Sequence, residues 1–134
     1  MTGKPEIQLI ANVVVDDGQG RVLLAAYDAP LEVDGDDIRW FLPAGELDPY
    51  DHPDEVARAA LDDVSGLSVH SIELAGVQSF RGRRGWHISF DYRARASGEP
   101  GARGAVSAKW FDRDALPRTA HGAWERATVE RVLG

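Results

Sequence analysis

The chain has 134 residues, of which 43% are hydrophobic and 28% are charged. This length and composition are typical of a globular protein with a single core, and we expect residues 1–134 to form one domain. A formal net charge of −7 argues against nonspecific binding to nucleic acids or to anionic membranes. The absence of cysteine excludes disulfide bonds and thiolate chemistry.

The amino terminus shows no targeting signal. The segment MTGKPEIQLIANVVV lacks the basic start, the long apolar run and the small-residue cleavage site of a signal peptide. No apolar run in the chain approaches the roughly 18 residues that a membrane-spanning helix needs. We therefore expect a cytoplasmic protein.

Three short apolar segments in the first half of the chain predict β-strands. Residues 7–15 (IQLIANVVV) and 21–27 (RVLLAAY) are separated by turn residues, which predicts a hairpin. The acidic segment 28–37 (DAPLEVDGDD) is interpreted as a solvated loop, although its carboxylates could also bind a cation. The third strand is expected over Ile38–Leu42 and runs into the sequence Pro-Ala-Gly.

A helix is expected to begin near Pro53. Proline is tolerated in the first helical turn, and Asp54 and Glu55 favour the positive end of the helix dipole. Three apolar residues at helical spacing predict the core-facing side of this helix: Ala57, Leu61 and Val64. Gly66 predicts its end.

The second half of the chain predicts three more strands and a closing helix. The strands are expected over residues 71–81, 86–96 and 105–111, and the helix over 120–133. Between the last strand and the helix, DRDALP predicts a single helical turn. The order β, β, β, α, β, β, β, α predicts a mixed sheet flanked by helices, in an α+β domain with α/β/α layers.

A regularly spaced pattern extends from Gly45 to Leu67 (GELDPYDHPDEVARAALDDVSGL). Its spacing resembles the Nudix box, in which a glycine is followed by five residues and a glutamate. Seven residues later the box continues with Arg-Glu, an aliphatic residue, any residue, Glu-Glu, any residue, glycine and an aliphatic residue. Here Asp51, residues 59–64 and Gly66 occupy these places without a gap. The LPAG entry and the AKWFDRDALP segment also resemble Nudix domains, so the resemblance covers nearly the whole chain and implies a Nudix-like mixed sheet between helices.

The resemblance also implies a chemistry for the predicted helix. In the family, glutamates at i, i+3 and i+4 share one face of the helix and hold Mg²⁺, which bridges a diphosphate and activates a water. The matching positions here are Ala60, Asp63 and Val64, so one carboxylate of three remains. The family's arginine is Ala59, and its earlier glutamate is Asp51. A site with Asp63 alone should bind a divalent cation weakly when no substrate is present.

A register shifted by one residue would restore part of this pattern. Arg58 would then take the arginine position, and Asp62 and Asp63 would take the Glu-Glu pair. This alternative needs an extra residue before Gly66 and moves Leu61 away from the predicted core face.

These considerations select a small set of candidate site residues. Asp51, Asp63 and His87 are the candidate catalytic residues, and Asp63 with Asp51 are the candidate ligands of Mg²⁺ or Mn²⁺. His87 is included because it lies on the polar face of its predicted strand. The candidate substrate-binding residues are Arg39, Gly45, Glu46 and Arg81.

Three functions remain open from the sequence. The first is a Nudix-fold protein with an impaired metal centre that binds a small phosphate-containing or nucleotide-like molecule, with lost, weak or repurposed hydrolase activity. The second is an active Mg²⁺-dependent pyrophosphohydrolase of a nucleoside diphosphate derivative. The third is a metal-free acid–base enzyme that uses His87 or Asp91 with a partner such as Arg81 or Glu73. We expect a small-molecule ligand, no nucleic acid or membrane partner, and a possible homodimer.

Overall fold

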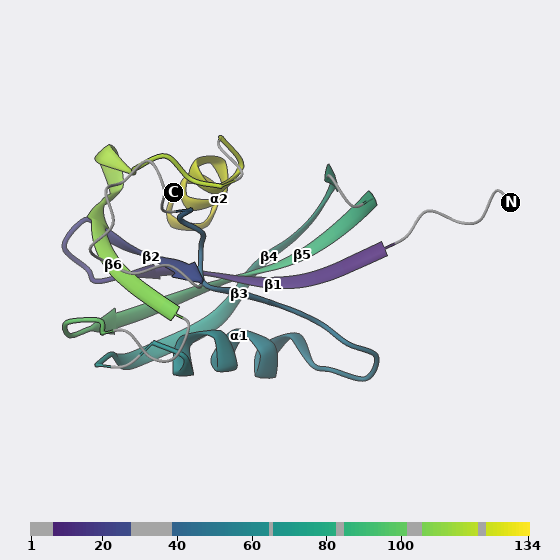
Figure 1. Cartoon of the computed structure of the whole chain (residues 1–134), viewed down its shortest axis with the longest axis horizontal. Helices are drawn as coiled ribbons and strands as arrows, with labels where there is room; N and C mark the ends of the chain where they lie inside the picture. Colours follow the sequence, from purple (N-terminus) through teal and green to yellow (C-terminus); the bar gives the residue numbers. More distant parts are fainter. Residues whose placement is uncertain (1–6, 28–38, 65, 83–84, 102–105, 121–122) are drawn as a thin grey trace, which may run out of the picture.

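A mixed β-sheet forms the middle layer of the molecule, with α1 below the sheet and α2 above it in Figure 1. The computed structural model describes residues 7–27, 39–64, 66–82, 85–101, 106–120 and 123–134. The elements in chain order are β1 (Ile7–Asp16), β2 (Arg21–Tyr27), β3 (Ala44–Glu46), α1 (Pro53–Asp62), β4 (Ser68–Gly82), β5 (Gly85–Ser97), β6 (Val106–Asp112), a 3-10 turn (Arg113–Ala115) and α2 (Ala123–Leu133). No helix within these ranges is long and apolar enough to cross a membrane.

The strands are arranged in the order β4-β5-β1-β2-β6, and β3 pairs with β1 outside this path. β1 runs parallel to β5 over its whole length, from Ile7 opposite Trp86 to Asp16 opposite Arg95. Its other edge is shared by β3, which pairs antiparallel with residues 10–12, and by β2, which joins at Asp16. The predicted hairpin of the first two strands and the predicted α+β layered fold are confirmed.

Alternation of side chains along β1 divides the core into two clusters, one on each face of the sheet. On the face covered by α1, β1 contributes every second residue from Ala11 to Val15. The helix contributes Ala57 and Leu61, and Val64 joins them just after its C-cap. The cluster on the opposite face consists of Val14, Val22, Leu24, Ala26, Trp40, Leu42 and Val129. The predicted core-facing side of the first helix is therefore confirmed.

Both ends of α1 agree with the prediction. Pro53 lies in the first turn with Asp54 and Glu55, and the helix is followed by Gly66 in a left-handed conformation with φ +84°. A Cβ atom at this glycine would lie 2.3 Å from the carbonyl oxygen of Glu99. Only glycine combines this backbone conformation with such a close approach.

The bounds of the predicted third strand, residues 38–42, are wrong. Within this segment only isolated bridges form, and β3 begins later, at Ala44. Pro43 explains the shift because it has no N–H to donate; its carbonyl accepts a hydrogen bond from the N–H of Val13 at 2.9 Å. The regular pairing with β1 starts only after this proline. Residues 28–38, which include the predicted acidic loop, lie outside the described residues.

A hydrogen bond from Tyr92 to Asp54 ties the first turn of α1 to β5. The Tyr92 hydroxyl donates to the Asp54 carboxylate, and the tyrosine side chain is buried in the core on the α1 face. Burial raises the pKa of Tyr92 to about 12, and the hydrogen bond to Asp54 adds to the shift because a phenolate could not donate it. The protonated hydroxyl is therefore the form that stabilises the fold.

Replacing Tyr92 with Phe should lower the free energy of unfolding by about 1 kcal/mol at neutral pH, because the hydrogen bond is lost and the ring is kept. The folded-state pKa lies above the ordinary value of 10.0, so the contribution of the hydroxyl is complete below that pH and is lost as the pH rises to about 12. Urea unfolding should show the difference between the wild type and Tyr92→Phe shrinking over this range. A difference that stays constant would contradict the assignment, and Tyr50→Phe, at a fully exposed site, is the control.

Tyr50 occupies an unfavourable backbone conformation in the turn that leads into α1. Its φ of 74° is positive, and its side chain is fully exposed. The turn around it is closed by the Asp48 N–H, which donates to the Asp51 carboxylate at 2.8 Å, and by the Asp51 N–H, which donates to the Asp48 carbonyl at 3.0 Å. The strain at Tyr50 is therefore set by the turn and is not offset by packing of the ring.

Replacing Tyr50 with Asn should raise the free energy of unfolding by about 0.5 kcal/mol, because Asn tolerates the left-handed region better than most residues. Tyr50→Ala is the matched control, since it removes the ring and keeps the strain. Thermal unfolding of the two variants measures the difference. An equal change in both would show that the ring, and not the backbone, determines the effect.

Candidate functional site

The site predicted from the spaced motif lies where the carboxyl end of α1 faces the end of β2 and the start of β3. Tyr27, the last residue of β2, accepts a hydrogen bond from the N–H of Ala44 at 3.1 Å and donates one to its carbonyl oxygen at 3.3 Å. Asp63 caps α1 and is close enough for its charge to act on Tyr27. Three segments that are distant in the sequence thus meet at one place.

The Tyr27 hydroxyl has a raised pKa. Burial is the largest cause, the N–H of Ala44 acts in the opposite direction, and the negative charge of Asp63 raises the pKa further. At neutral pH the hydroxyl stays protonated, so it donates to and accepts from Ala44 and holds the turn before β3. Sequence reasoning missed this residue, and its only signal was its place at the end of a strand.

The positions that correspond to metal ligands, at the carboxyl end of α1, differ in their exposure. Asp63 is exposed, whereas Ala60 and Val64 are buried, with 6% and 4% of their surface accessible to solvent. Leu61 is also buried, which is the place that the unshifted register of the motif gives to its aliphatic residue. One carboxylate of the expected three therefore remains at this end of the helix, beside two apolar side chains.

The residues present do not fit the carboxylate cluster that the resemblance implies. Mg²⁺ requires oxygen ligands in nearly octahedral geometry. Among the described residues, no group of three or more His, Cys, Asp or Glu side chains could hold a metal ion. Asp51, the other candidate ligand, precedes the start of α1, and the ten-residue helix places it about 15 Å from Asp63. One ion cannot contact both.

Two of the candidate substrate-binding residues belong to β3. Gly45 lies against α1, where an added Cβ would come within 2.8 Å of the Val56 side chain, so a glycine lets the strand approach the helix. Glu46 is exposed and pairs opposite Ile10. Arg39, also exposed, precedes Trp40 in the segment that leads to this strand. Gly45 and Glu46 directly follow Ala44, the residue that Tyr27 hydrogen-bonds.

His87 and Arg81 lie elsewhere. His87 points to the α2 face of the sheet, where its ring stacks on Phe80 with centroids 5.0 Å apart and Phe80 in turn contacts Trp124 of α2. Its Nδ1 is 3.1 Å from the carbonyl oxygen of Gly85. Arg81 is exposed near the tip of the β4–β5 hairpin, at the opposite end of the sheet from the carboxyl end of α1 (Figure 1). The sheet therefore separates His87 from Asp63, and its length separates Arg81 from Asp63.

Asp91, named in the acid–base hypothesis, lies in a buried polar network under α2. Its carboxylate accepts hydrogen bonds from Ser89 at 2.5 Å, from Gln78 at 2.7 Å and from Asn12 at 3.4 Å. Gln78 also reaches Thr128 of α2 at 3.4 Å. Asp91 is 2% exposed. These hydrogen bonds link β1, β4 and β5 to one another, and Gln78 links them to α2. The signal for this network was polar Asn12 within an apolar strand.

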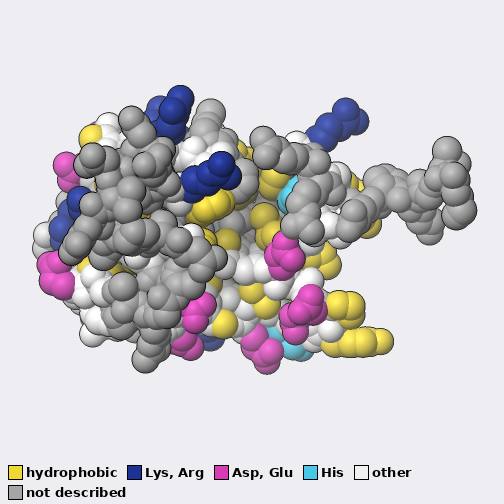
Figure 2. Space-filling model, in the orientation of Figure 1, with side chains coloured by type: hydrophobic (Ala, Val, Ile, Leu, Met, Phe, Trp, Pro, Cys, Tyr) yellow, Lys and Arg dark blue, Asp and Glu magenta, His cyan; other side chains and the backbone are white. Residues whose placement is uncertain are grey.

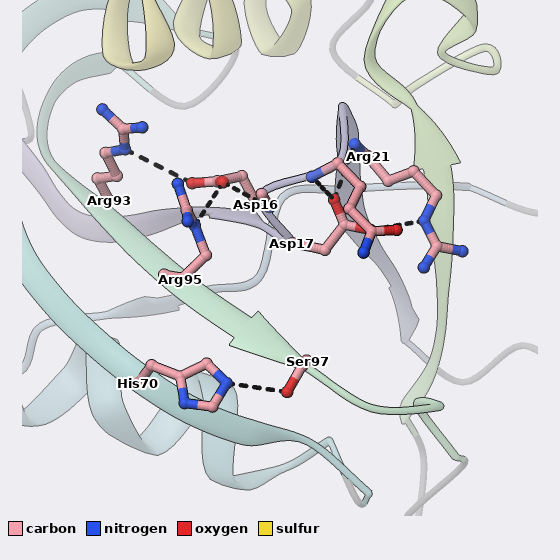
Figure 3. Close-up of polar contacts among 9 residues, drawn as sticks. Asp16, Asp17, Arg21, His70, Arg93, Arg95 and Ser97 are labelled. Atoms are coloured by element: carbon pink, nitrogen blue, oxygen red, sulfur yellow. Dashed lines mark hydrogen bonds and ion pairs between the residues drawn. The ribbon is translucent and has the colours of Figure 1, made fainter.

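A second polar cluster lies at the far end of the same face (Figure 3). Buried Asp16 pairs with the Nε atom of Arg95 at 2.7 Å and with that of Arg93 at 3.5 Å. The two arginines line an open pocket of about 240 Å³ together with Ser71 and Glu73. Glu73, the other partner suggested for an acid–base mechanism, is therefore on the face opposite α1.

Comparison with known proteins agrees with this fold and motif. The family model of the NUDIX domain matches residues 6–132. No curated protein sequence matches the chain. Among solved structures, the chain is similar to a MutT NUDIX hydrolase from Burkholderia pseudomallei, with a TM-score of 0.71 and 20% identity over 95% of this chain and 98% of that chain.

Two further structures show the same likeness. A NUDIX hydrolase from Nitrosomonas europaea has a TM-score of 0.67 and 17% identity, covering 94% of this chain and 88% of that chain. An ADP-ribose pyrophosphatase from Streptococcus suis has a TM-score of 0.67 and 16% identity, covering 94% of this chain and 89% of that chain. At these identities the structural likeness shows the fold, while the family model covers nearly the entire chain. The protein therefore belongs to the NUDIX domain family.

Proposed function

We propose that this protein binds a small phosphate-containing or nucleotide-like molecule at the site formed by Tyr27, β3 and the carboxyl end of α1. We further propose that metal-dependent hydrolysis at this site is lost, weak or replaced by other chemistry. The observation that carries the proposal is the burial of Ala60 and Val64 at the positions where the motif places two of its three carboxylates. Asp63 is the acid that remains exposed there.

The physical reason lies in the cost of charge next to apolar surface. A divalent cation loses hydration when it is bound, and several anionic oxygens must replace the lost water ligands. Asp63 supplies one carboxylate, and the methyl groups of Ala60 and Val64 supply none. Further oxygens would come from retained water and from the ligand itself. Affinity for a free ion at this site should therefore be low.

The family and the net charge of the chain both support this ligand class. NUDIX hydrolases act on small nucleotide compounds, and one structural neighbour is an ADP-ribose pyrophosphatase. ADP-ribose is therefore a suitable first probe. The net charge of −7 supports a small ligand over a nucleic acid.

A second candidate function is active Mg²⁺-dependent hydrolysis of a nucleoside diphosphate derivative, in which the substrate phosphates supply most of the metal ligands. The exposure of Asp63 at the end of α1 favours it, because this carboxylate is free of core packing. The two candidates differ in what the replacement of Asp63 should do.

Incubation with Mg²⁺ or Mn²⁺ and a panel of nucleoside diphosphate derivatives, including ADP-ribose, should give no robust turnover. An active NUDIX hydrolase assayed in parallel is the positive control. Asp63→Asn should leave any residual rate unchanged. Robust turnover of any of these compounds would reject the proposal, and its loss in Asp63→Asn would establish the second candidate.

The free energy of unfolding should show how strongly the site-facing positions of α1 depend on core packing. Ala60→Glu should lower the free energy of unfolding by about 2 kcal/mol or more, because a carboxylate enters a buried site. Ala59→Glu, at the exposed neighbouring position, is the matched control and should change it by less than about 0.5 kcal/mol. Equal effects in urea unfolding would show that position 60 tolerates a ligand side chain.

A further inference from the structure

The sheet carries an exposed strip of large apolar side chains on one face. The members of this apolar strip are Ile7 and Leu9 of β1, Val69, Leu74 and Val77 of β4, and Trp86 of β5. Each exposes between 37% and 56% of its surface. Among the described residues, the one other large apolar side chain that is equally exposed is Tyr50, in the turn before α1. The exposed apolar surface is thus concentrated on three adjacent strands.

Strand register places the apolar strip on the face that α1 covers only in part. Val77 pairs with Phe90 and Leu74 with Tyr92, and both aromatic partners pack in the core beneath α1. Directly paired residues share a face, so the strip continues this core outward. α1 contacts mainly β1 and β3, so no helix of the described residues covers the part of this face over β4.

The size of the strip is in the range of a protein interface. Six half-exposed side chains of this kind present on the order of 400 Å² of apolar surface, whereas scattered single residues are normal on a monomer. A stable interface buries roughly 800 Å² per partner, of which the apolar centre is one part and the polar rim another. The strip therefore supplies about half of such an interface, and its charged surroundings can supply the rest.

Charges of opposite sign lie beside the strip at one end of the sheet. Arg81 is opposite Trp86 in the register of β4 and β5, so it shares the face of the strip. The start of α1 lies at the same end and carries four exposed acids: Asp48, Asp51, Asp54 and Glu55. Figure 2 shows acidic side chains gathered over this region. A surface with an apolar centre, a basic flank and an acidic flank is complementary to itself.

We infer that a second copy of this chain docks on the apolar strip, in a two-fold dimer whose axis runs along the strands. Rotation about this axis places the β4 side of one strip over the β1 side of the other. The hairpin end of each strip stays at the same end of the dimer. The Arg81 side of one copy then faces the acidic start of α1 in the other, and the two strips cover each other. The same contact occurs twice, as a two-fold interface requires.

The edge of β4 is a less suitable contact than its face. Two irregularities interrupt the register of this strand, between Val69 and Ser71 and between Leu74 and Gly76. Bulges of this kind disrupt the regular ladder that edge-to-edge pairing needs. Pairing at the edge would also leave the strip exposed on both copies, whereas docking through the face buries it.

Sedimentation velocity of the full chain over a range of concentrations tests the dimer. The wild type should be dimeric, and Val77→Glu should weaken the dimer by at least about tenfold, because it places a charge at the centre of the contact. Gln19→Glu, in an exposed turn away from the strip, is the matched control and should not change it. A wild type that stays monomeric at its highest soluble concentration would overturn the inference, as would a dimer that Val77→Glu leaves intact.

A charge exchange tests the arrangement of the two copies. Arg81→Glu and Glu55→Arg should each weaken the dimer, and the double variant should recover most of the loss because the pairing is restored with its signs reversed. Arg126→Glu, on an exposed position of α2, is the control for a change in net charge. If the double variant is no better than the single ones, the proposed axis is wrong. The ligand site is not part of this contact, so its failure and that of the proposed function are distinguishable.

Discussion

The packing of α1 against the sheet is the constraint on which the rest of this structure depends. Ala57, Leu61 and Val64 enter the core beneath the helix, and Ala60 is buried beside them. A ten-residue helix is too short to be stable by itself, so this packing must hold it in place. Two of the buried positions are those at which the family motif carries metal ligands. Here both positions are buried and contribute to packing.

The first turn of α1 is also held against the sheet. Tyr92 holds the first turn through Asp54, and Gly66 lets the chain turn sharply after the last one. Both ends of the helix are thus fixed to the sheet while its carboxyl end faces Tyr27 and Ala44. The position of this end of the helix relative to Tyr27 and Ala44 is therefore set by the packing of the whole helix on the sheet.

The sequence could predict the features that depend on local periodicity. Alternation identified the long strands, and the spacing of Ala57, Leu61 and Val64 identified the core side of the helix. Helix geometry is equally local, and the spacing of the motif predicts Asp63 as the carboxylate that remains of its acidic face. Pro43 shows the limit, because the start of β3 depends on which partner strand supplies the hydrogen bonds. That partner is distant in the sequence.

The same limit applies to the site residues. His87 and Arg81 were reasonable candidates by residue type, but sheet topology places His87 under α2 and Arg81 at the hairpin tip. Asp91 was named as a possible acid–base residue, and the packing of α2 buries it among neutral donors. Tyr27 had no motif to identify it. Which face of the sheet each helix covers is a long-range property, and a single sequence carries little information about it.

The central claim is that the end of α1 cannot bind a divalent cation firmly. Electron paramagnetic resonance of Mn²⁺ tests it most directly, since the free ion gives a strong signal that is lost on binding. Titration of Mn²⁺ into the protein, with and without ADP-ribose, should leave the free-ion signal undiminished in the absence of ligand. A stoichiometric loss of signal with the protein alone, removed by Asp63→Asn, would contradict the account.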